Sequence, residues 1–147
     1  MKIRSITAKE TFIVRHPVLR PGKPLEECVF EFDNNPSSIH LGLEIEGSII
    51  SVLSALPIQC EDFPLLNGMR LRGIATLEEY QKKGFGTHLM NEIEKRLLKL
   101  KEFKLLWLNA RINSSGFYQK LEYKTVGGYF NIPGIGLHQR YFKKLRS

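Results

Sequence analysis

The spacing of hydrophobic residues in the first third of the chain predicts a strand, a helix and then three more strands. Residues 1–5 alternate between apolar and polar side chains, as a half-buried strand does. Residues 7–19 follow as a helix, because Thr7 and Glu10 have the spacing of a capping box. Pro17 is expected to end or kink this helix near its C-terminus.

Three short apolar runs then predict strands, of which the last two form a hairpin. The runs cover residues 28–32, 39–45 and 48–56, and a loop rich in proline and glycine precedes the first of them. Glu46 and Gly47 separate the second run from the third. A two-residue connection of this kind is typical of a tight turn between antiparallel strands.

The rest of the chain predicts a strand–helix–strand unit, followed by a short helix and two closing strands. Strand 69–76 leads through a glycine loop to helix 87–101, whose apolar residues form one stripe, and then to a buried strand at 105–108. The two strands of such a unit are expected to be parallel, with a right-handed crossover. The remaining elements are a helix over 113–121 and strands over 123–126 and 138–142, which the glycine-rich residues 127–136 connect.

The composition is that of one folded domain, and its charge points to an anionic partner. The chain has 147 residues, of which 42% are hydrophobic and 25% charged, so we expect residues 1–147 to form a single domain. Against 15 Asp and Glu there are 22 Lys and Arg, which gives a formal net charge of +7. A basic domain favours a nucleic acid, an acidic membrane surface or a phosphorylated cofactor.

Cysteine content and apolar stretches indicate a cytoplasmic protein. Cys28 and Cys60 are expected to be reduced thiols that pack in the interior, because a small secreted domain would carry more cysteines. The longest largely apolar stretch, residues 49–58, is too short to span a bilayer, and residues 1–10 lack the apolar segment of a signal peptide. The cysteines and histidines show no ligand spacing, so no metal is expected.

The glycine loop, Gln81 to Thr87 (QKKGFGT), has the features of a pyrophosphate site. It joins a strand end to a helix start, where unpaired backbone N–H groups carry partial positive charge. Glycines let such a backbone approach an oxyanion closely, and two lysines add charge. The spacing fits neither a Walker loop nor a dinucleotide fingerprint, but it does fit Q-x-x-G-x-G.

Three motifs together resemble the GNAT superfamily of acyl-CoA N-acyltransferases. They are Arg72 to Thr76 (RGIAT), the glycine loop, and Asn113 to Tyr123 (NSSGFYQKLEY). The resemblance implies an α/β fold with a mixed, mostly antiparallel sheet, a central splayed pair of parallel strands and flanking helices. It also implies transfer of an acetyl group from acetyl-CoA to a primary amine, by direct attack through a tetrahedral intermediate. We expect a small-molecule acceptor, with a protein or peptide amine as the alternative.

The resemblance also implies which residues bind coenzyme A. In the family, the pantetheine arm pairs with the backbone of the strand before the loop, as an added strand would. The corresponding residues here are Ile74, Ala75 and Thr76, and those of the pyrophosphate loop are Gln81, Lys82, Lys83, Gly84, Phe85, Gly86 and Thr87. Asn113 is similar to the family's polar contact at the start of the next helix, and a plain helix cap is an equal alternative.

Candidate catalysts follow from the same resemblance. Tyr118 occupies the tyrosine position of the family's motif, so we expect it to contact the cofactor and to protonate the departing thiolate, although Glu122 stands where that motif usually has glycine. Strand 69–76 has no carboxylate, whereas many relatives place a glutamate there. The base is therefore His138, His40 or ordered water, since an imidazole pKa near about 6.5 suits a base at neutral pH.

Arginines predict an anionic group on the acceptor. Arg70 and Arg72 lie two apart on one face of their strand, and Arg20, with Arg15 of the first helix, belongs to the region where family members usually bind the acceptor. Such arginines would bind a carboxylate or phosphate. A solvent-exposed polar face is the alternative for Arg70 and Arg72.

Two rival functions are a nucleic-acid binder and an acyl-CoA-binding module without catalysis. No nucleic-acid motif accompanies the basic residues near the C-terminus, so we expect neither a nucleic-acid nor a membrane partner. The missing strand glutamate keeps the non-catalytic module open. A homodimer is left open as well.

Overall fold

The computed structural model describes residues 1–145, which divide into two compact units. The first unit holds Met1–Pro57 and Leu71–Arg96, and the second holds Ile58–Arg70 and the residues from Leu97 onward. Hydrogen-bonded strands follow the order β1-β2-β3-β4-β5-β7-β6 in a seven-stranded sheet. The expected mixed, mostly antiparallel α/β fold is therefore confirmed.

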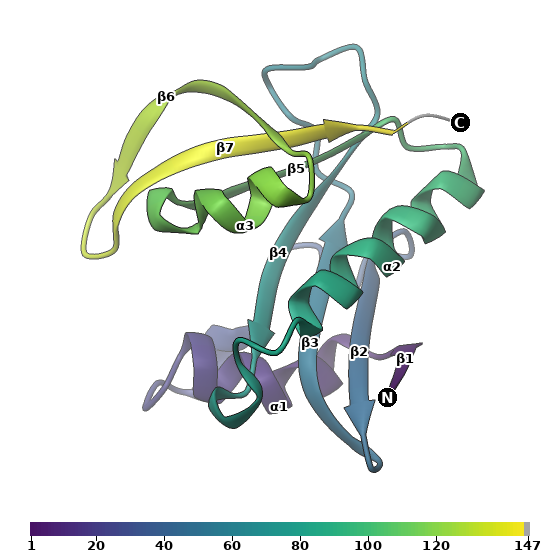
Figure 1. Ribbon diagram of the computed structural model, residues 1–147, viewed down its shortest axis with the longest axis vertical. Helices are drawn as coiled ribbons and strands as arrows, with labels where there is room; N and C mark the ends of the chain where they lie inside the picture. The colour runs from purple at the N-terminus through teal and green to yellow at the C-terminus, as the bar shows by residue number, and fades with distance from the viewer. Residues whose placement is uncertain (146–147) are drawn as a thin grey trace. The chain divides into compact units, whose positions relative to one another are not determined.

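The first unit is an antiparallel sheet with a helix on each face. Its strands are β1 (Lys2–Ser5), β2 (Ile39–Ile45), β3 (Ser48–Leu56) and the later residues of β4 (Gly68–Thr76). Figure 1 shows α1 (Ala8–Leu19) behind these strands and α2 (Phe85–Leu100) in front of them. The apolar core beneath α1 comprises Ile6, Val14, Ile49, Val52 and Ala75.

Local signals set the ends of these elements as the sequence predicts. The Thr7 hydroxyl accepts from the Glu10 amide at 3.1 Å, and the Glu10 carboxylate accepts from the Thr7 amide at 2.9 Å, which completes the capping box. Pro17 lies inside α1, and the helix ends two residues later at Leu19. Glu46 and Gly47, both with positive φ, form the predicted turn between β2 and β3.

The strand predicted over residues 28–32 is wrong. Residues Leu25–Cys28 form the short 3₁₀ helix η1, and a turn follows in which Phe32 has a φ of 72°. The alternating pattern is genuine, but the backbone there bonds to side chains instead of to a neighbouring strand. Arg15 donates to the Cys28 carbonyl at 2.9 Å, and the Asp33 carboxylate accepts from the Phe30 amide at 2.9 Å. Tertiary contacts therefore override the local strand preference.

The second unit contains the parallel strand pair that the sequence predicts. Gly68, Met69 and Arg70 of β4 pair in parallel with β5 (Leu105–Arg111), and β5 pairs on its other side with β7 (Gly136–Lys144). The Trp107 indole donates to the Ile58 carbonyl at 2.8 Å and closes the core around Cys60 and Leu105. Both cysteines are free and buried, as expected.

The glycine-rich residues 127–136 are not the connecting loop that the sequence predicts. Strand β6 runs over Lys124–Ile132 and pairs with β7, so that only a turn at 133–135 connects the two strands. A bulge between Val126 and Phe130 takes up the irregular part of the segment. Backbone pairing along this long hairpin offsets the low strand preference of glycine.

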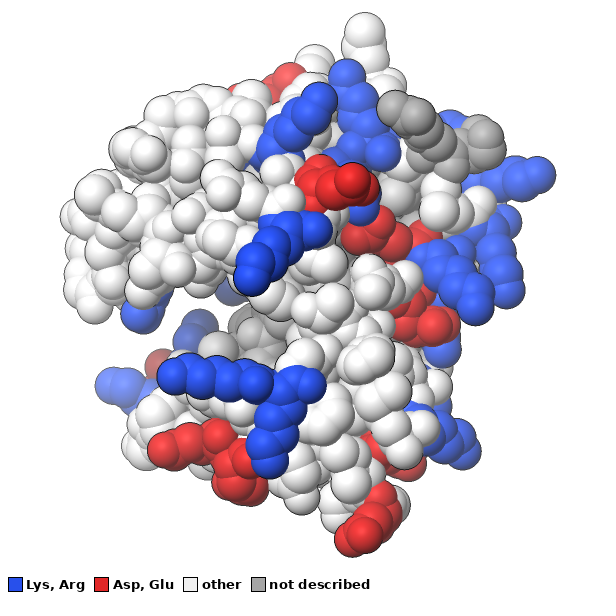
Figure 2. Space-filling model, in the orientation of Figure 1, with Lys and Arg blue, Asp and Glu red and all other residues white. Residues whose placement is uncertain are grey.

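Charge is absent from most of the β6–β7 hairpin. Residues 125–139 contain no Lys, Arg, Asp or Glu, and Figure 2 shows a broad white area where Figure 1 places these strands. The chain's positive charge is therefore carried by other segments. In the described part of the chain, no helix has the length and apolar character needed to cross a bilayer.

Candidate functional site

In the part of the chain that the structure describes, the loop between β4 and α2 presents a row of backbone amides without backbone acceptors. Lys82 and Gly84 have φ values of 62° and 85°, and α2 begins directly afterwards at Phe85. Among the described residues, no backbone carbonyl accepts from the amides of Lys82 to Thr87. The Gln81 side chain donates to the Thr76 carbonyl at 2.9 Å and so ties the loop to the strand end. Such a loop can bind an oxyanion through its main chain.

The strand before this loop has one edge that its parallel neighbour does not cover. Pairing of β4 with β5 extends only from Gly68 to Arg70, although β4 continues to Thr76. The Ser51 hydroxyl donates to the Ala75 carbonyl at 3.1 Å and lies 2.7 Å from the Thr76 hydroxyl, which anchors the strand end to β3. An unpaired strand edge requires hydrogen-bond partners, and an extended ligand with amide groups can provide them.

Glycine is required where this open edge begins. Gly73 has a φ of 64°, and a Cβ atom there would lie 2.7 Å from the Phe30 ring and 3.2 Å from Arg15 Nε. A side chain at residue 73 would therefore be strained by the left-handed backbone conformation as well as by these contacts. The close approach of Phe30 to the strand therefore depends on the absence of a side chain at residue 73.

Beneath Phe30 lies a buried ion pair that sequence reasoning missed. Arg15 and Asp33 form two hydrogen bonds, of 2.7 and 3.0 Å, and the Arg15 side chain is 0% exposed. Arg15 also donates to the Ser54 hydroxyl at 2.8 Å. The signal in the sequence was weak: Arg15 follows Thr11 and Val14 on the buried face of α1, where a cation requires a partner.

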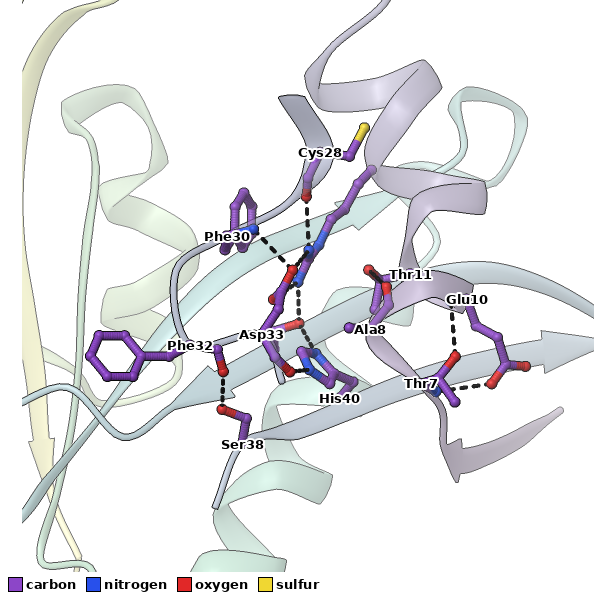
Figure 3. Close-up of polar contacts among 12 residues, drawn as sticks. Thr7, Ala8, Glu10, Thr11, Cys28, Phe30, Phe32, Asp33, Ser38 and His40 are labelled. Carbon is purple, nitrogen blue, oxygen red and sulfur yellow. Dashed lines mark hydrogen bonds and ion pairs between the residues drawn. The ribbon is translucent and has the colours of Figure 1, made fainter. Parts of the chain in front are cut away.

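The hydrogen bonds around this pair form a closed circuit, shown in Figure 3 around Asp33 and His40. A carbonyl can only accept, so His40 Nε2 donates to the Asp33 carbonyl at 2.8 Å. Nδ1 of a neutral His40 is then the acceptor for the Ser54 hydroxyl at 2.7 Å. Both ring nitrogens are thus used inside the core, which leaves His40 no free lone pair for a substrate proton.

The three arginines predicted to bind the acceptor have separate environments. Arg72 lies over the Phe30 ring, 4.2 Å from guanidinium carbon to ring centroid, and Arg20 donates to the Leu19 carbonyl at 2.9 Å. Both belong to the first unit. Arg70, in the second unit, lies over the Trp107 ring at 5.2 Å.

Tyr118 lies in the second unit, on α3 (Ser115–Lys120), in a group of aromatic rings. Its ring centroid is 5.0 Å from that of Phe117 and 5.1 Å from that of Tyr141. Burial, with a smaller contribution from Tyr141, raises the pKa of Tyr118 to about 12. The phenol therefore keeps its proton at neutral pH and has a proton to donate.

His138 and Asn113 lie in the same unit as Tyr118. His138 is buried in β7 opposite Arg111, and its Nδ1 donates to the Gly136 carbonyl at 2.9 Å, so that Nε2 is the basic nitrogen of the neutral ring. Asn113 is exposed in the short 3₁₀ helix η3 (Ile112–Ser114). Ser114, and not Asn113, occupies the cap position of α3, so Asn113 is not a plain helix cap.

Glu122 adopts the backbone conformation for which the family motif uses glycine. Its φ is 68°, and the turn after α3 closes through the Tyr123 amide, which donates to the Tyr118 carbonyl at 3.0 Å. Replacing Glu122 with Gly is expected to raise the free energy of unfolding by about 0.5–1 kcal/mol, because glycine adopts this conformation without strain. Urea denaturation would measure the change. Gln119→Gly, at an exposed residue within α3, should lower stability by up to about 1 kcal/mol; a loss of stability in both variants would contradict the assignment.

The sequence-predicted residues thus fall into two sets. The first unit holds the strand end, the glycine loop, Arg20, Arg72 and His40. The second unit holds Arg70, Asn113, Tyr118 and His138. Each set has its own chemistry: main-chain donors and guanidinium groups in the first, and a protonated phenol with an imidazole in the second.

Comparisons with known proteins identify relatives in sequence and in fold. The Acetyltransferase (GNAT) family matches residues 6–123. The chain is 37% identical to the uncharacterized N-acetyltransferase YitI of Bacillus subtilis, over all of this chain and 98% of that protein. Its fold is similar to that of an aminoglycoside 6′-N-acetyltransferase complexed with coenzyme A (TM-score 0.77, 17% identity, 100% and 98% of the two chains). It is also similar to that of Escherichia coli ElaA (TM-score 0.78, 14% identity, 97% and 98%).

Family and fold therefore lead to one assignment. The matched family covers most of the chain, including β4, the glycine loop and α3. The sequence resemblance to the GNAT superfamily is thereby confirmed. The chain belongs to the GNAT family of acetyltransferases and is an acyl-CoA-dependent N-acyltransferase.

Proposed function

We propose that this protein transfers an acetyl group from acetyl-CoA to the primary amine of a small molecule. The observation that carries the proposal is the row of unpartnered amides from Lys82 to Thr87, directly after a strand edge that β5 does not cover. In CoA, the diphosphate can accept hydrogen bonds from the loop amides, and the amide groups of the extended pantetheine arm can pair with the uncovered strand edge. We propose one catalytic domain over residues 1–147.

The residues present fit the cofactor. The loop amides and the exposed Lys82 and Lys83 would hold the pyrophosphate, and backbone groups of Ile74, Ala75 and Thr76 would pair with pantetheine. Gly84 has a φ of 85°, and a Cβ atom there would meet only open space, so the loop stays open for phosphate oxygens. Asn113 and Tyr118 remain proposed contacts to the same cofactor.

Acetyl-CoA supplies a thioester carbonyl that a neutral amine attacks directly. His138, through Nε2, or ordered water takes the proton that the amine loses as the carbon–nitrogen bond forms. Tyr118 would supply its phenolic proton to the departing thiolate and would regain a proton from solvent. His40 acts in this proposal as a positioning residue, because its ring nitrogens are committed to Asp33 and Ser54.

Binding of CoA by the loop predicts a large difference between ligands. CoA should bind at least about 100-fold more tightly than pantetheine, because charge-assisted hydrogen bonds to the diphosphate each contribute about 1.5–3 kcal/mol. The double change Lys82→Gln and Lys83→Gln should weaken CoA binding about 3- to 30-fold, since both charges are exposed. Calorimetry would measure both effects. Lys95→Gln, an exposed lysine elsewhere on α2, is the matched control.

Catalysis is tested by thiol release from acetyl-CoA with a panel of primary amines. Release that depends on the amine, together with an acetylated product, is the expected result. The absence of a carboxylate from strand residues 69–76 supports a second candidate, a CoA-binding module without catalysis. Tight CoA binding without thiol release from any amine would favour that candidate.

Three further possibilities stay predictions from the sequence: a protein or peptide acceptor, a homodimer and a cytoplasmic location.

A further inference from the structure

Arg72 and Arg20 are two cations that lack an acidic partner. Arg15, the third arginine near them, is neutralised by Asp33 through bonds of 2.7 and 3.0 Å. Within residues 1–145, no carboxylate forms an ion pair with Arg72 or Arg20. Burial, and then the charges of Arg20 and Arg15, lower the pKa of Arg72, as expected for a half-buried cation beside like charges.

The Phe30 ring holds Arg72 in place without neutralising it. The ring lies 3.9 Å from the Arg15 guanidinium carbon and 4.2 Å from that of Arg72, so it interacts with two cations at once. Phe30 is itself fixed, because its amide donates to the Asp33 carboxylate at 2.9 Å. Its ring edge packs against Gly73, where a Cβ atom would clash with it. A guanidinium that stacks on an aromatic ring keeps its edge N–H donors for a second partner. For Arg72, no such partner exists among the described residues.

The position of Arg72 on β4 relates it to the proposed reaction. The glycine loop follows the strand end at Thr76. A pantetheine arm that paired with Thr76, Ala75 and Ile74, as proposed above, would place its thioester end toward Gly73. Arg72 is the next residue, at about 3.3 Å per residue along a strand. Arg72 therefore lies next along the strand from the proposed location of the thioester.

We propose that Arg72 binds an oxyanion on the acceptor, so that the preferred substrate is a primary amine that also carries a carboxylate or phosphate. The proposal rests on the proposed acetyl transfer, and it names the substrate class of that site. A guanidinium without an ion-pair partner attracts such an anion and repels a polycationic amine. The structure thus favours amino acids and aminoalkyl phosphates over polyamines.

The test compares acceptors that differ only in the anion. Wild-type protein is assayed with amino acids, their carboxamides, phosphoethanolamine, ethanolamine and spermidine, and amino acids are told apart from phosphates by their kcat/KM. Arg72→Gln should raise KM for the preferred anionic amine about 10- to 100-fold with a smaller change in kcat, and leave KM for the neutral amines unchanged. Arg72→Lys should retain part of the effect, and Lys95→Gln should match wild type.

A binding measurement tests the same subsite without depending on turnover. N-acetyl amino acids and N-acetylphosphoethanolamine are titrated against neutral counterparts, N-acetyl amino acid amides and N-acetylethanolamine, by calorimetry with wild-type and Arg72→Gln protein. An anionic preference of at least tenfold that Arg72→Gln abolishes supports the subsite. Equal binding of charged and neutral probes would overturn the subsite. Efficient acetylation of spermidine and neutral amines, at rates that Arg72→Gln does not change, would also overturn it but would leave acetyl transfer standing.

The proposed function has a separate test. If no amine caused thiol release from acetyl-CoA, that result would count against acetyl transfer alone, because the binding measurement does not depend on turnover.

Discussion

Tyr118→Phe is expected to lower kcat about 100- to 1000-fold while KM for acetyl-CoA and amine changes little. The substitution removes the phenolic proton proposed for the leaving sulfur but preserves the ring that packs against Phe117 and Tyr141. Because burial raises the pKa of Tyr118 to about 12, the wild-type phenol stays protonated throughout the usual assay range. The rate should therefore show no loss from phenol ionisation between about pH 7 and 10. Steady-state kinetics over that range would measure both effects.

Tyr129→Phe provides the matched control for Tyr118. Tyr129 lies on β6 with 66% of its surface exposed, so loss of its hydroxyl should leave kcat unchanged. If Tyr118→Phe kept more than half of the wild-type kcat with an unchanged pH profile, Tyr118 would not be the acid. Water would then be the remaining donor to the thiolate.

Arg15→Met is expected to lower the free energy of unfolding by about 3–5 kcal/mol. The substitution leaves the Asp33 carboxylate buried without its cation, and an uncompensated buried charge has a cost of that order. Ser54 loses the same donor, and the Cys28 carbonyl loses its bond from Arg15. Urea unfolding followed by circular dichroism would measure the change.

The double variant Arg15→Met with Asp33→Leu separates the cost of an unpaired buried charge from the cost of altered packing. Removing both charges should cost less than removing Arg15 alone, because no ion is then left without a partner. Arg96→Met is a suitable control, since its ion pair with Glu92 is partly exposed and should contribute at most about 1 kcal/mol. A loss of less than about 1 kcal/mol in Arg15→Met would show that the buried pair does not hold this region together.

Elements with strong local signals could be predicted from the sequence. The capping box of Thr7 and Glu10, the Glu46–Gly47 turn and the apolar stripe of α2 each depend on residues a few positions apart. The parallel pairing of β4 and β5 was predictable because a strand–helix–strand unit leaves few alternatives. The glycine loop belongs to the same class, since the binding proposed for it depends on its own backbone.

Residues 28–32 and 127–136 could not be assigned correctly from local pattern. In the first segment the backbone is bonded by Arg15, which is distant in sequence, and by Asp33. In the second, pairing between β6 and β7 outweighs the weak strand preference of the glycines. Both results depend on which partners the fold provides, and hydrophobic spacing does not encode those partners.

The candidate site shows the same division. The loop residues and Tyr118 could be proposed from the sequence because they stand in motifs, whereas Arg15, Phe30, Asp33 and Ser54 stand in none. His40 shows how a residue type can mislead: an imidazole suggests a base, but its bonds to Ser54 and Asp33 commit both nitrogens to the core. Only the tertiary structure distinguishes the two uses.

The closed circuit through Arg15, Ser54, His40 and Asp33 has a consequence for how this protein can diverge. The circuit links Asp33, which follows the proline- and glycine-rich residues after α1, to His40 of β2 and Ser54 of β3. Residues 21–27, which precede it, are exposed. We expect insertions, deletions and substitutions in residues 21–27 to be tolerated, because Phe30 is held by Asp33 and Arg15 and not by this loop. The residues around the proposed acceptor site could therefore vary among relatives, while the Phe30 ring that stacks on Arg72 is retained.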